Sequence, residues 1–223
     1  LAGSQEFLAK GKQLAAAELE AAIVDMRYHE GRFKVVGTSI GIGLFELAAR
    51  QAEHSFSTET EKEVEGRSWP NGCHIAEVEI DPDTGSVRLV SHGSVEDAGN
   101  LINPMIVEGQ LQGGIAQGAG QALLELSEYD SEGQLLTGSF MDYAMPRADD
   151  FPFFESSTYA DAPCLTNPLG AKGVGEIGVV GSIPAIANAI LDALWEGGVR
   201  TFDMPAYPQK IWKLLQKQSR KTI

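Results

Sequence analysis

Cysteine is scarce in this sequence of 223 residues: Cys73 and Cys164 are the only two. They lie far apart, form no C-x-x-C pair and have no histidine at the spacing of a metal-ligand pair. We therefore assign no metal ligands and interpret both cysteines as free thiols in a reducing compartment.

Basic residues are also few. The chain has 17 lysines and arginines against 31 aspartates and glutamates, which gives a formal net charge of −14 at pH 7. A nucleic-acid partner is disfavoured, because binding to a phosphate backbone depends on clustered Lys and Arg. The acidic balance is more typical of a well-solvated surface.

Long apolar runs are absent. The most apolar stretch, residues 178–195, is interrupted by Ser182, Pro184, Asn188 and Asp192, whereas a membrane-spanning helix needs about 20 predominantly apolar residues. It is therefore interpreted as a core helix, and no membrane partner is expected. The N-terminal residues lack a basic segment followed by an apolar run, so no secretory signal is visible and a cytoplasmic location is expected.

The apolar content is nevertheless 43%, enough for one substantial core or two modest ones. The polar stretch "EHSFSTETEKEVEGRSWPNG", residues 53–72, has no periodicity and is the only plausible internal boundary. Before it, the pattern predicts a helix over residues 7–24, a hairpin turning at Glu30-Gly31 and a second helical segment from Ser39 to about Ala52.

After the polar stretch, apolar residues alternate in "CHIAEVEIDPDTGSVRLVSHGSV", which predicts a β-hairpin. His74 and His92 flank this hairpin. Isolated histidines in strands are far more often packed or solvent-facing than ligands, so we assign them no function.

Asn103 and Pro104 are typical of a helix start, and the helix that they open contains five glycines. Each costs about 1 kcal/mol relative to alanine, so a ligand or another helix is expected to approach its backbone closely. A short strand at residues 135–140, a helix opened by Ser182 and Pro184, and an amphipathic C-terminal helix complete the pattern. This irregular alternation favours an α+β fold of mixed hairpins packed with helices.

The segment "GAKGVGEIG" contains Gly173, Gly175 and Gly178 at the spacing G-x-G-x-x-G around Glu176. A dinucleotide site requires a strand before the first glycine and a helix that starts within the motif, and we expect neither here. A loop that merely turns the chain and a carboxylate that acts as a base both remain open from these residues alone.

Three longer stretches carry a family resemblance: "VEDAGNLINPMIVEGQLQGGIAQGAGQALLE", "YDSEGQLLTGSFMDYAMPRADDFP" and "GAKGVGE". In this order they resemble the C-terminal part of the large, molybdenum-cofactor-binding subunit of the xanthine dehydrogenase, aldehyde oxidase and carbon monoxide dehydrogenase family. The resemblance is nearest to the carbon-monoxide-dehydrogenase-like branch. It implies a molybdenum cofactor-binding domain-like fold over residues 1–223.

The resemblance also implies roles for individual residues. Glu176 matches the family's base, which stands beside the molybdenum, and we expect it to be buried among its neighbours. Gln110 matches a glutamine that hydrogen-bonds the pterin. The backbone of Lys172, Gly173, Val174 and Gly175 then lines the cofactor pocket, which explains the glycines without a nucleotide.

By this resemblance the chain is part of a molybdenum hydroxylase that oxidises a small substrate with water-derived oxygen. Its expected partners are the N-terminal remainder of the large subunit, an iron–sulfur subunit, and a flavin subunit or domain. The molybdenum–pterin cofactor is expected in the complete enzyme and not on this chain alone, because the family's further cofactor contacts come from other segments of the large subunit. The two cysteines do not suffice for a four-cysteine iron–sulfur cluster. The alternatives are a structural fragment inactive outside the assembly and, more weakly, a nicotinamide-dependent oxidoreductase.

Overall fold

The computed structural model describes residues 1–61, 63 and 66–219, and the chain divides into two compact units, Leu1–Glu65 and Gly66–Ile223. The boundary falls inside the polar stretch 53–72. Each unit has its own apolar core.

The first unit packs helix α1 against a small antiparallel sheet. Gly11 lies on the inner face of α1, where a Cβ atom would come within 2.5 Å of the Phe33 ring, so the missing side chain lets the ring pack on the helix. Phe33 is fully buried. The elements are α1 (Ala2–Glu18), η1 (Ile23–Asp25), β1 (Met26–His29), β2 (Arg32–Val35), β3 (Gly41–Gly43) and α2 (Leu44–Ala49).

The hairpin predicted at Glu30-Gly31 is confirmed, with both residues at positive φ between β1 and β2. The helix predicted after Ser39 begins only at Leu44. The residues before it form β3 instead, because Gly41 and Ile42 pair with β2.

The sheet of the second unit contains β4 (Asn71–Ile80), β5 (Val87–Asp97) and β6 (Glu155–Thr158). Strands β4 and β5 form the predicted hairpin, and β6 lies parallel to β5. The strand predicted at residues 135–140 is wrong: that segment lies in a loop, where Leu135 makes only an isolated bridge to Tyr129. The loop also contains the short helix η2 (Ala148–Asp150).

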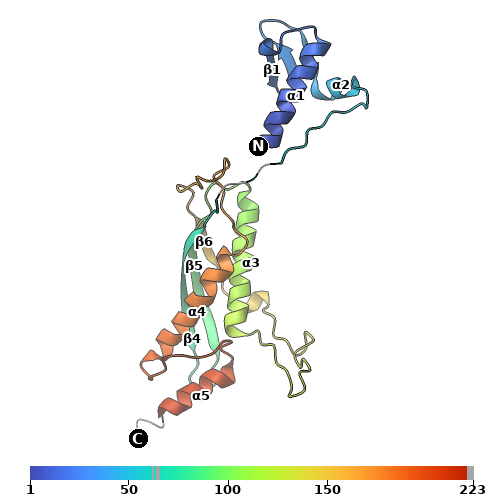
Figure 1. Cartoon of the computed structure of the whole chain (residues 1–223). Helices are drawn as coiled ribbons and strands as arrows, with labels where there is room; N and C mark the ends of the chain where they lie inside the picture. The colour runs from blue at the N-terminus through green and yellow to red at the C-terminus, as the bar shows by residue number, and fades with distance from the viewer. Residues whose placement is uncertain (62, 64–65, 220–223) are drawn as a thin grey trace. The chain divides into compact units, whose positions relative to one another are not determined.

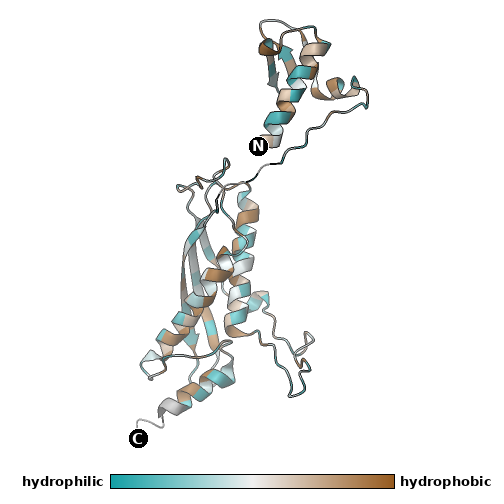
Figure 2. Cartoon of the chain, viewed as in Figure 1, coloured by the Kyte–Doolittle hydropathy of each residue, from teal (hydrophilic) through white to brown (hydrophobic). Residues whose placement is uncertain are grey.

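Helices α3 (Pro104–Leu123) and α4 (Ile177–Trp195) lie together on one face of this sheet (Figure 1). The predicted cap is confirmed, since the Asn103 side chain accepts a hydrogen bond from the Ile106 amide at 3.2 Å. Hydrophobic residues recur along both helices (Figure 2). Helix α5 (Pro208–Ser219) is the predicted C-terminal helix.

Four of the five glycines of α3 fall into two environments. Gly114 and Gly118 face α4, where a Cβ on Gly114 would lie 3.0 Å from the Gly178 Cα. Gly109 and Gly113 have no described atom within 4 Å of a built Cβ. One strip of small residues therefore serves helix packing, and the other is open in the described part of the chain.

Helix α4 begins at Ile177, earlier than the sequence predicted, so Pro184 lies inside the helix instead of opening it. The first turn is held by a hydrogen bond from the Val180 amide to the Glu176 carbonyl at 3.0 Å and by the packing of Gly178 on α3. By length and composition α4 also resembles a membrane span. Ile186, Ile190 and Leu194 of this helix are buried in the core, whereas Val180 and Trp195 are exposed.

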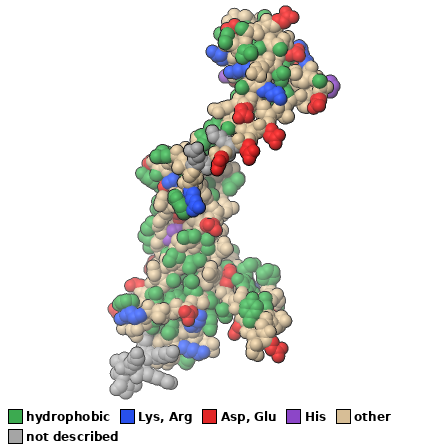
Figure 3. Space-filling view, in the orientation of Figure 1, with side chains coloured by type: hydrophobic (Ala, Val, Ile, Leu, Met, Phe, Trp, Pro, Cys, Tyr) green, Lys and Arg blue, Asp and Glu red, His purple; other side chains and the backbone are tan. Residues whose placement is uncertain are grey.

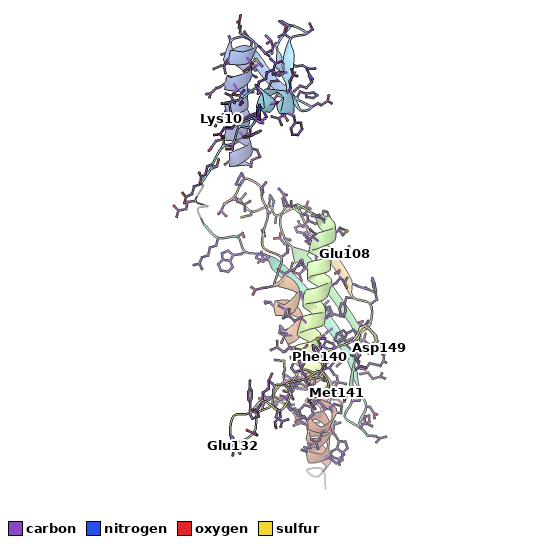
Figure 4. The ribbon with its side chains drawn as sticks, turned by 90° about the vertical axis from the view of Figure 1, so that its right-hand side faces the viewer. Lys10, Glu108, Glu132, Phe140, Met141 and Asp149 are labelled. Carbon is purple, nitrogen blue, oxygen red and sulfur yellow. The ribbon has the colours of Figure 1, made fainter. Side chains whose placement is uncertain are left out.

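Hydrophobic side chains also reach the surface over α3, α4 and the loop that follows α3 (Figure 3). In that loop Phe140 and Met141 are 81% and 92% exposed. They lie near the C-terminal end of α3, whereas Glu108 lies toward its N-terminal end (Figure 4).

Candidate functional site

A cleft of about 530 Å³ lies at the N-terminal end of α4, beside the ends of β4 and β5. It collects residues from three separate segments of the second unit, 68–74, Glu96 and 173–181. Its lining residues are Ser68, Trp69, Pro70, Asn71, Gly72, His74, Glu96, Gly173, Gly175, Glu176, Ile177, Val180 and Gly181.

Glu176 occupies the N-cap position of α4, and its side chain makes no capping hydrogen bond. The residue is exposed, which corrects the expectation that it is buried among its neighbours. Because α4 starts directly after it, the carboxylate stands at the positive end of a helix dipole, where a negative charge is stabilised. The position leaves its oxygens free to meet a ligand.

The loop that carries Glu176 is fixed to the end of β5. The Asn100 amide donates to the Gly170 carbonyl at 2.9 Å, and the Lys172 amide donates to the Ala98 carbonyl at 2.9 Å. The Lys172 ammonium also contacts the Asp97 carboxylate at 2.5 Å, with both side chains largely buried. Hydrogen bonding by Lys172 lowers the pKa of Asp97. These contacts give the glycine loop a defined place on the sheet.

The other predicted cofactor contacts lie in different places. Gly173 and Gly175 line the cleft, whereas Lys172 and Val174 are not part of its lining. Gln110 is exposed on α3, next to Leu111, whose carbonyl oxygen meets Gly178 in the first turn of α4. Gln110 itself is not among the residues that line the cleft.

Three polar side chains inside the second unit form a cluster that the sequence did not reveal. The His74 Nε2 atom hydrogen-bonds the Glu96 Oε1 atom, and the His74 Nδ1 atom lies 3.4 Å from the His92 Nε2 atom. The His74 and Glu96 side chains are only 4% and 2% exposed. Both line the cleft that contains Glu176.

Burial decides the protonation of this cluster, because it disfavours the charged form of each group. It raises the pKa of Glu96 to about 7 and lowers the pKa of His74. Burial, assisted by repulsion from His74, lowers the pKa of His92 to about 4. Near neutral pH the cluster therefore holds neutral imidazoles beside a carboxyl group that titrates.

Strand register brings these side chains together. Across the hairpin His74 pairs with Ser94, and Gly72 pairs with Glu96. The hairpin turn was predicted correctly, so the residues that face each other across the two strands could have been sought by counting outward from the turn. That count gives pairs that are wrong by one residue from Glu77 onward, because the register shifts between Glu77 and Val78.

The "Molybdopterin cofactor-binding domain" family model matches residues 1–152 of the chain. The chain belongs to this family. It is 38% identical over 218 residues to the 6-hydroxypseudooxynicotine dehydrogenase complex subunit gamma of Paenarthrobacter nicotinovorans, covering 93% of the chain and 27% of that protein. It is 34% identical over 224 residues to the carbon monoxide dehydrogenase large chain of Hydrogenophaga pseudoflava, covering 97% and 28%.

Solved structures agree with this assignment. The chain resembles the reconstituted carbon monoxide dehydrogenase from Oligotropha carboxidovorans with a TM-score of 0.82 and 30% identity, over 99% of this chain and 28% of that one. For quinoline 2-oxidoreductase from Pseudomonas putida 86 the TM-score is 0.77 and the identity 36%, over 94% and 28%. The predicted family and α+β fold are confirmed. The chain spans about a quarter of the length of the relatives that it matches.

The glycine loop fits a bulky cofactor. A Cβ atom built on Gly173 or Gly175 meets no described protein atom within 4 Å, and neither residue has a positive φ. The fold of this chain therefore does not require glycine at these two positions, although both line the cleft. Space kept free beside exposed backbone is the property that a pterin ligand would use.

A dinucleotide fingerprint requires a strand before its first glycine. Helix α4 does open within the motif, contrary to the sequence-based expectation, but residues 161–172 contain no strand beyond the isolated bridge at Ala171. The nicotinamide alternative therefore lacks the element that would orient the glycines toward a pyrophosphate.

Proposed function

We propose that this chain forms one wall of the cofactor and substrate site in the large subunit of a molybdenum hydroxylase. Its relatives carry the names of carbon monoxide dehydrogenase and 6-hydroxypseudooxynicotine dehydrogenase subunits. The observation that carries the proposal is the position of Glu176: an exposed carboxylate at the N-terminus of α4, in a cleft whose glycines leave backbone uncovered.

The overall reaction joins a substrate and water. In a hydroxylation a C–H bond of the substrate breaks, one oxygen from water enters the product, and two protons and two electrons are released. Carbon monoxide has no C–H bond, so with this substrate both protons come from water and the product is carbon dioxide. The bound molybdenum–pterin group supplies the two-electron oxidation. The Glu176 carboxylate accepts a proton from the water-derived nucleophile as its oxygen attacks the substrate, which is general-base catalysis.

Within this proposal, other groups of the chain contact the cofactor or hold the glycine loop in place. Gly173 and Gly175 expose backbone to the pterin, and the Gln110 amide both donates to it and accepts from it. The ion pair between Lys172 and Asp97 holds the loop in register with β5. The rest of the large subunit, an iron–sulfur partner and a flavin partner complete the site and carry the electrons away.

The test is Glu176→Gln in the complete enzyme, with kcat and molybdenum content measured on the same preparation. The amide keeps the size of the side chain but does not accept the proton, so we expect kcat to fall by roughly 10²–10⁴ with molybdenum content little changed. Glu196→Gln is the matched control, because Glu196 is an exposed carboxylate at the other end of α4. An unchanged kcat at full molybdenum loading would remove Glu176 from the mechanism.

A further inference from the structure

The cluster of His74, Glu96 and His92 forms a hydrogen-bonded series that leads from the cleft into the interior of the second unit. Glu96 and His74 line the cleft, and His92 lies behind them with its ring edge-on to Phe154, at 5.7 Å between ring centroids. His92 is 1% exposed. The series therefore has one end at the cleft and one end in the core.

Two glycines make room for these side chains. A Cβ atom on Gly72 would overlap the Glu96 carboxyl group, and a Cβ atom on Gly181 of α4 would overlap the His74 ring. The sheet and the helix each lack a side chain where the cluster needs space. The arrangement is thus built into both layers of the fold and is not a chance contact of flexible groups.

The hydrogen bonds of the series have one direction that suits their surroundings. A neutral imidazole donates from one nitrogen and accepts at the other. When His74 Nε2 donates to the Glu96 Oε1 atom, His74 Nδ1 accepts from His92 Nε2, and His92 Nδ1, which has no hydrogen-bond partner among the described residues, carries no proton. The second carboxyl oxygen of Glu96, Oε2, is then the atom that takes or loses a proton. One proton gained or lost at Glu96 is therefore accommodated without a change of histidine tautomer.

The other charges near the cluster are mostly negative. The lining of the cleft contains the carboxylate of Glu176 and, among the described residues, no lysine or arginine. Lys172 is engaged with Asp97, next to Glu96 in the strand. Strand β6 contributes the Glu155 carboxylate, whose residue pairs with Gly93 next to His92, and α3 contributes Glu108; Gln112 of α3 donates to the Phe154 carbonyl and to the Ser156 hydroxyl. A second negative charge beside Glu176 is thus not compensated, which favours a neutral Glu96.

We propose that Glu96 and His74 form a second proton-accepting site on the floor of the cleft, which receives the proton from the Glu176 carboxylate after each oxidation. This role rests on the proposed function, in which two protons are released per turnover while the electrons leave through the molybdenum–pterin group. Glu96 takes the proton on its Oε2 atom while Oε1 still accepts from His74 Nε2, and Glu176 is again ionised; Glu96 then releases the proton to water in the cleft before the next turnover. Glu96 and His74 act through Glu176 and are positioning residues.

The proton site itself is testable on the 223-residue chain without cofactor. Ring signals of the four histidines are followed by NMR as a function of pH, with the exposed His29 and His54 as references. We expect the His74 and His92 rings to report one shared transition near pH 7, caused by Glu96. Glu96→Gln should abolish this transition.

Glu77→Gln is the control, because Glu77 lies on the same hairpin with its side chain exposed, and it should leave the shared transition in place. A transition that survives Glu96→Gln, or independent titration of His74 and His92 in the wild type, overturns the proposal. The wild-type titration decides by itself if the Glu96→Gln chain does not fold.

In the complete enzyme Glu96→Gln should change the pH dependence of kcat near neutrality, whereas Glu176→Gln should lower kcat at every pH. A normal rate for Glu176→Gln overturns the proposed function, while the shared NMR transition still establishes the proton site. An unaltered pH–rate profile for Glu96→Gln overturns its assigned role in turnover.

Discussion

The contact between α3 and α4 positions the first turn of α4 and therefore Glu176, and Gly178→Ala tests it directly. A Cβ atom at position 178 would lie 2.6 Å from the Leu111 carbonyl oxygen, 2.9 Å from the Ile115 amide nitrogen and 3.0 Å from the Gly114 Cα. All three atoms belong to the backbone of α3. No side chain can rotate away, so the two helices must separate locally.

The magnitude follows from two opposing terms. Overpacking of a core costs about 1–3 kcal/mol, while alanine in place of glycine favours a helix by up to about 1 kcal/mol. We expect Gly178→Ala to lower the free energy of unfolding of the second unit by about 1–2 kcal/mol. At about 2–4 °C per kcal/mol for a chain of this size, the Tm should fall by about 2–8 °C.

Gly113→Ala is the matched control. Gly113 lies in α3 beside Gly114, but a Cβ there meets nothing within 4 Å, so only the helix term applies. It should raise the stability by about 0.5–1 kcal/mol. All three tryptophans, Trp69, Trp195 and Trp212, belong to the second unit, so urea unfolding followed by tryptophan fluorescence reports on this unit alone. Destabilisation by Gly113→Ala equal to that by Gly178→Ala would refute the reasoning.

Three further outcomes are expected. Gly175→Ala should lower the molybdenum content of the complete enzyme without destabilising the 223-residue chain, because no described atom contacts a Cβ at that position. Equal molybdenum content would count against the cofactor contact. Gln110→Ala should reduce cofactor occupancy through the loss of hydrogen bonds worth about 1–3 kcal/mol, measured as molybdenum per protein. The pKa of Asp97 is lower in the folded state than in the unfolded state, so its carboxylate stabilises the second unit at pH values above the unfolded pKa and loses that effect as the pH falls through the folded pKa. Asp97→Asn should therefore make the urea midpoint depend less on pH in the acid range. The same dependence of the urea midpoint on pH in the variant and the wild type would contradict this.

Local sequence signals predicted much of the fold. Asn103 and Pro104 predicted the start of α3, since a side-chain acceptor followed by a residue without an amide proton suits a helix N-terminus. The hairpin of β4 and β5 followed from alternation around a turn. Strand β6 was missed because "ESST" has little apolar alternation, and its pairing with β5 joins residues about 60 positions apart.

In the candidate site, too, the sequence singled out residues, whereas packing set their positions. The resemblance of "GAKGVGE" to a cofactor loop singled out Glu176, Gly173 and Gly175, and all three line one cleft. Where α4 begins was not visible in the sequence, because Pro184 and Ser182 indicate a helix start just as well. The packing of Gly178 on the α3 backbone extends the helix to Ile177, which places Glu176 at its exposed N-terminus.

The amino-acid sequence by itself determined the family, the hairpins and the glycine loop, because each depends on neighbouring residues. Only the tertiary structure decided that His74, His92 and Glu96 share one face. Strand β5 contains an extra residue, Val90, opposite the step from Glu77 to Val78. Before this residue the buried side chain is that of Leu89, and after it the buried side chains are those of His92, Ser94 and Glu96. Side chains alternate with a period of two, and a single inserted residue therefore moves every later side chain to the opposite face. Without that bulge the two histidines and the glutamate would not form the cluster beside the cleft.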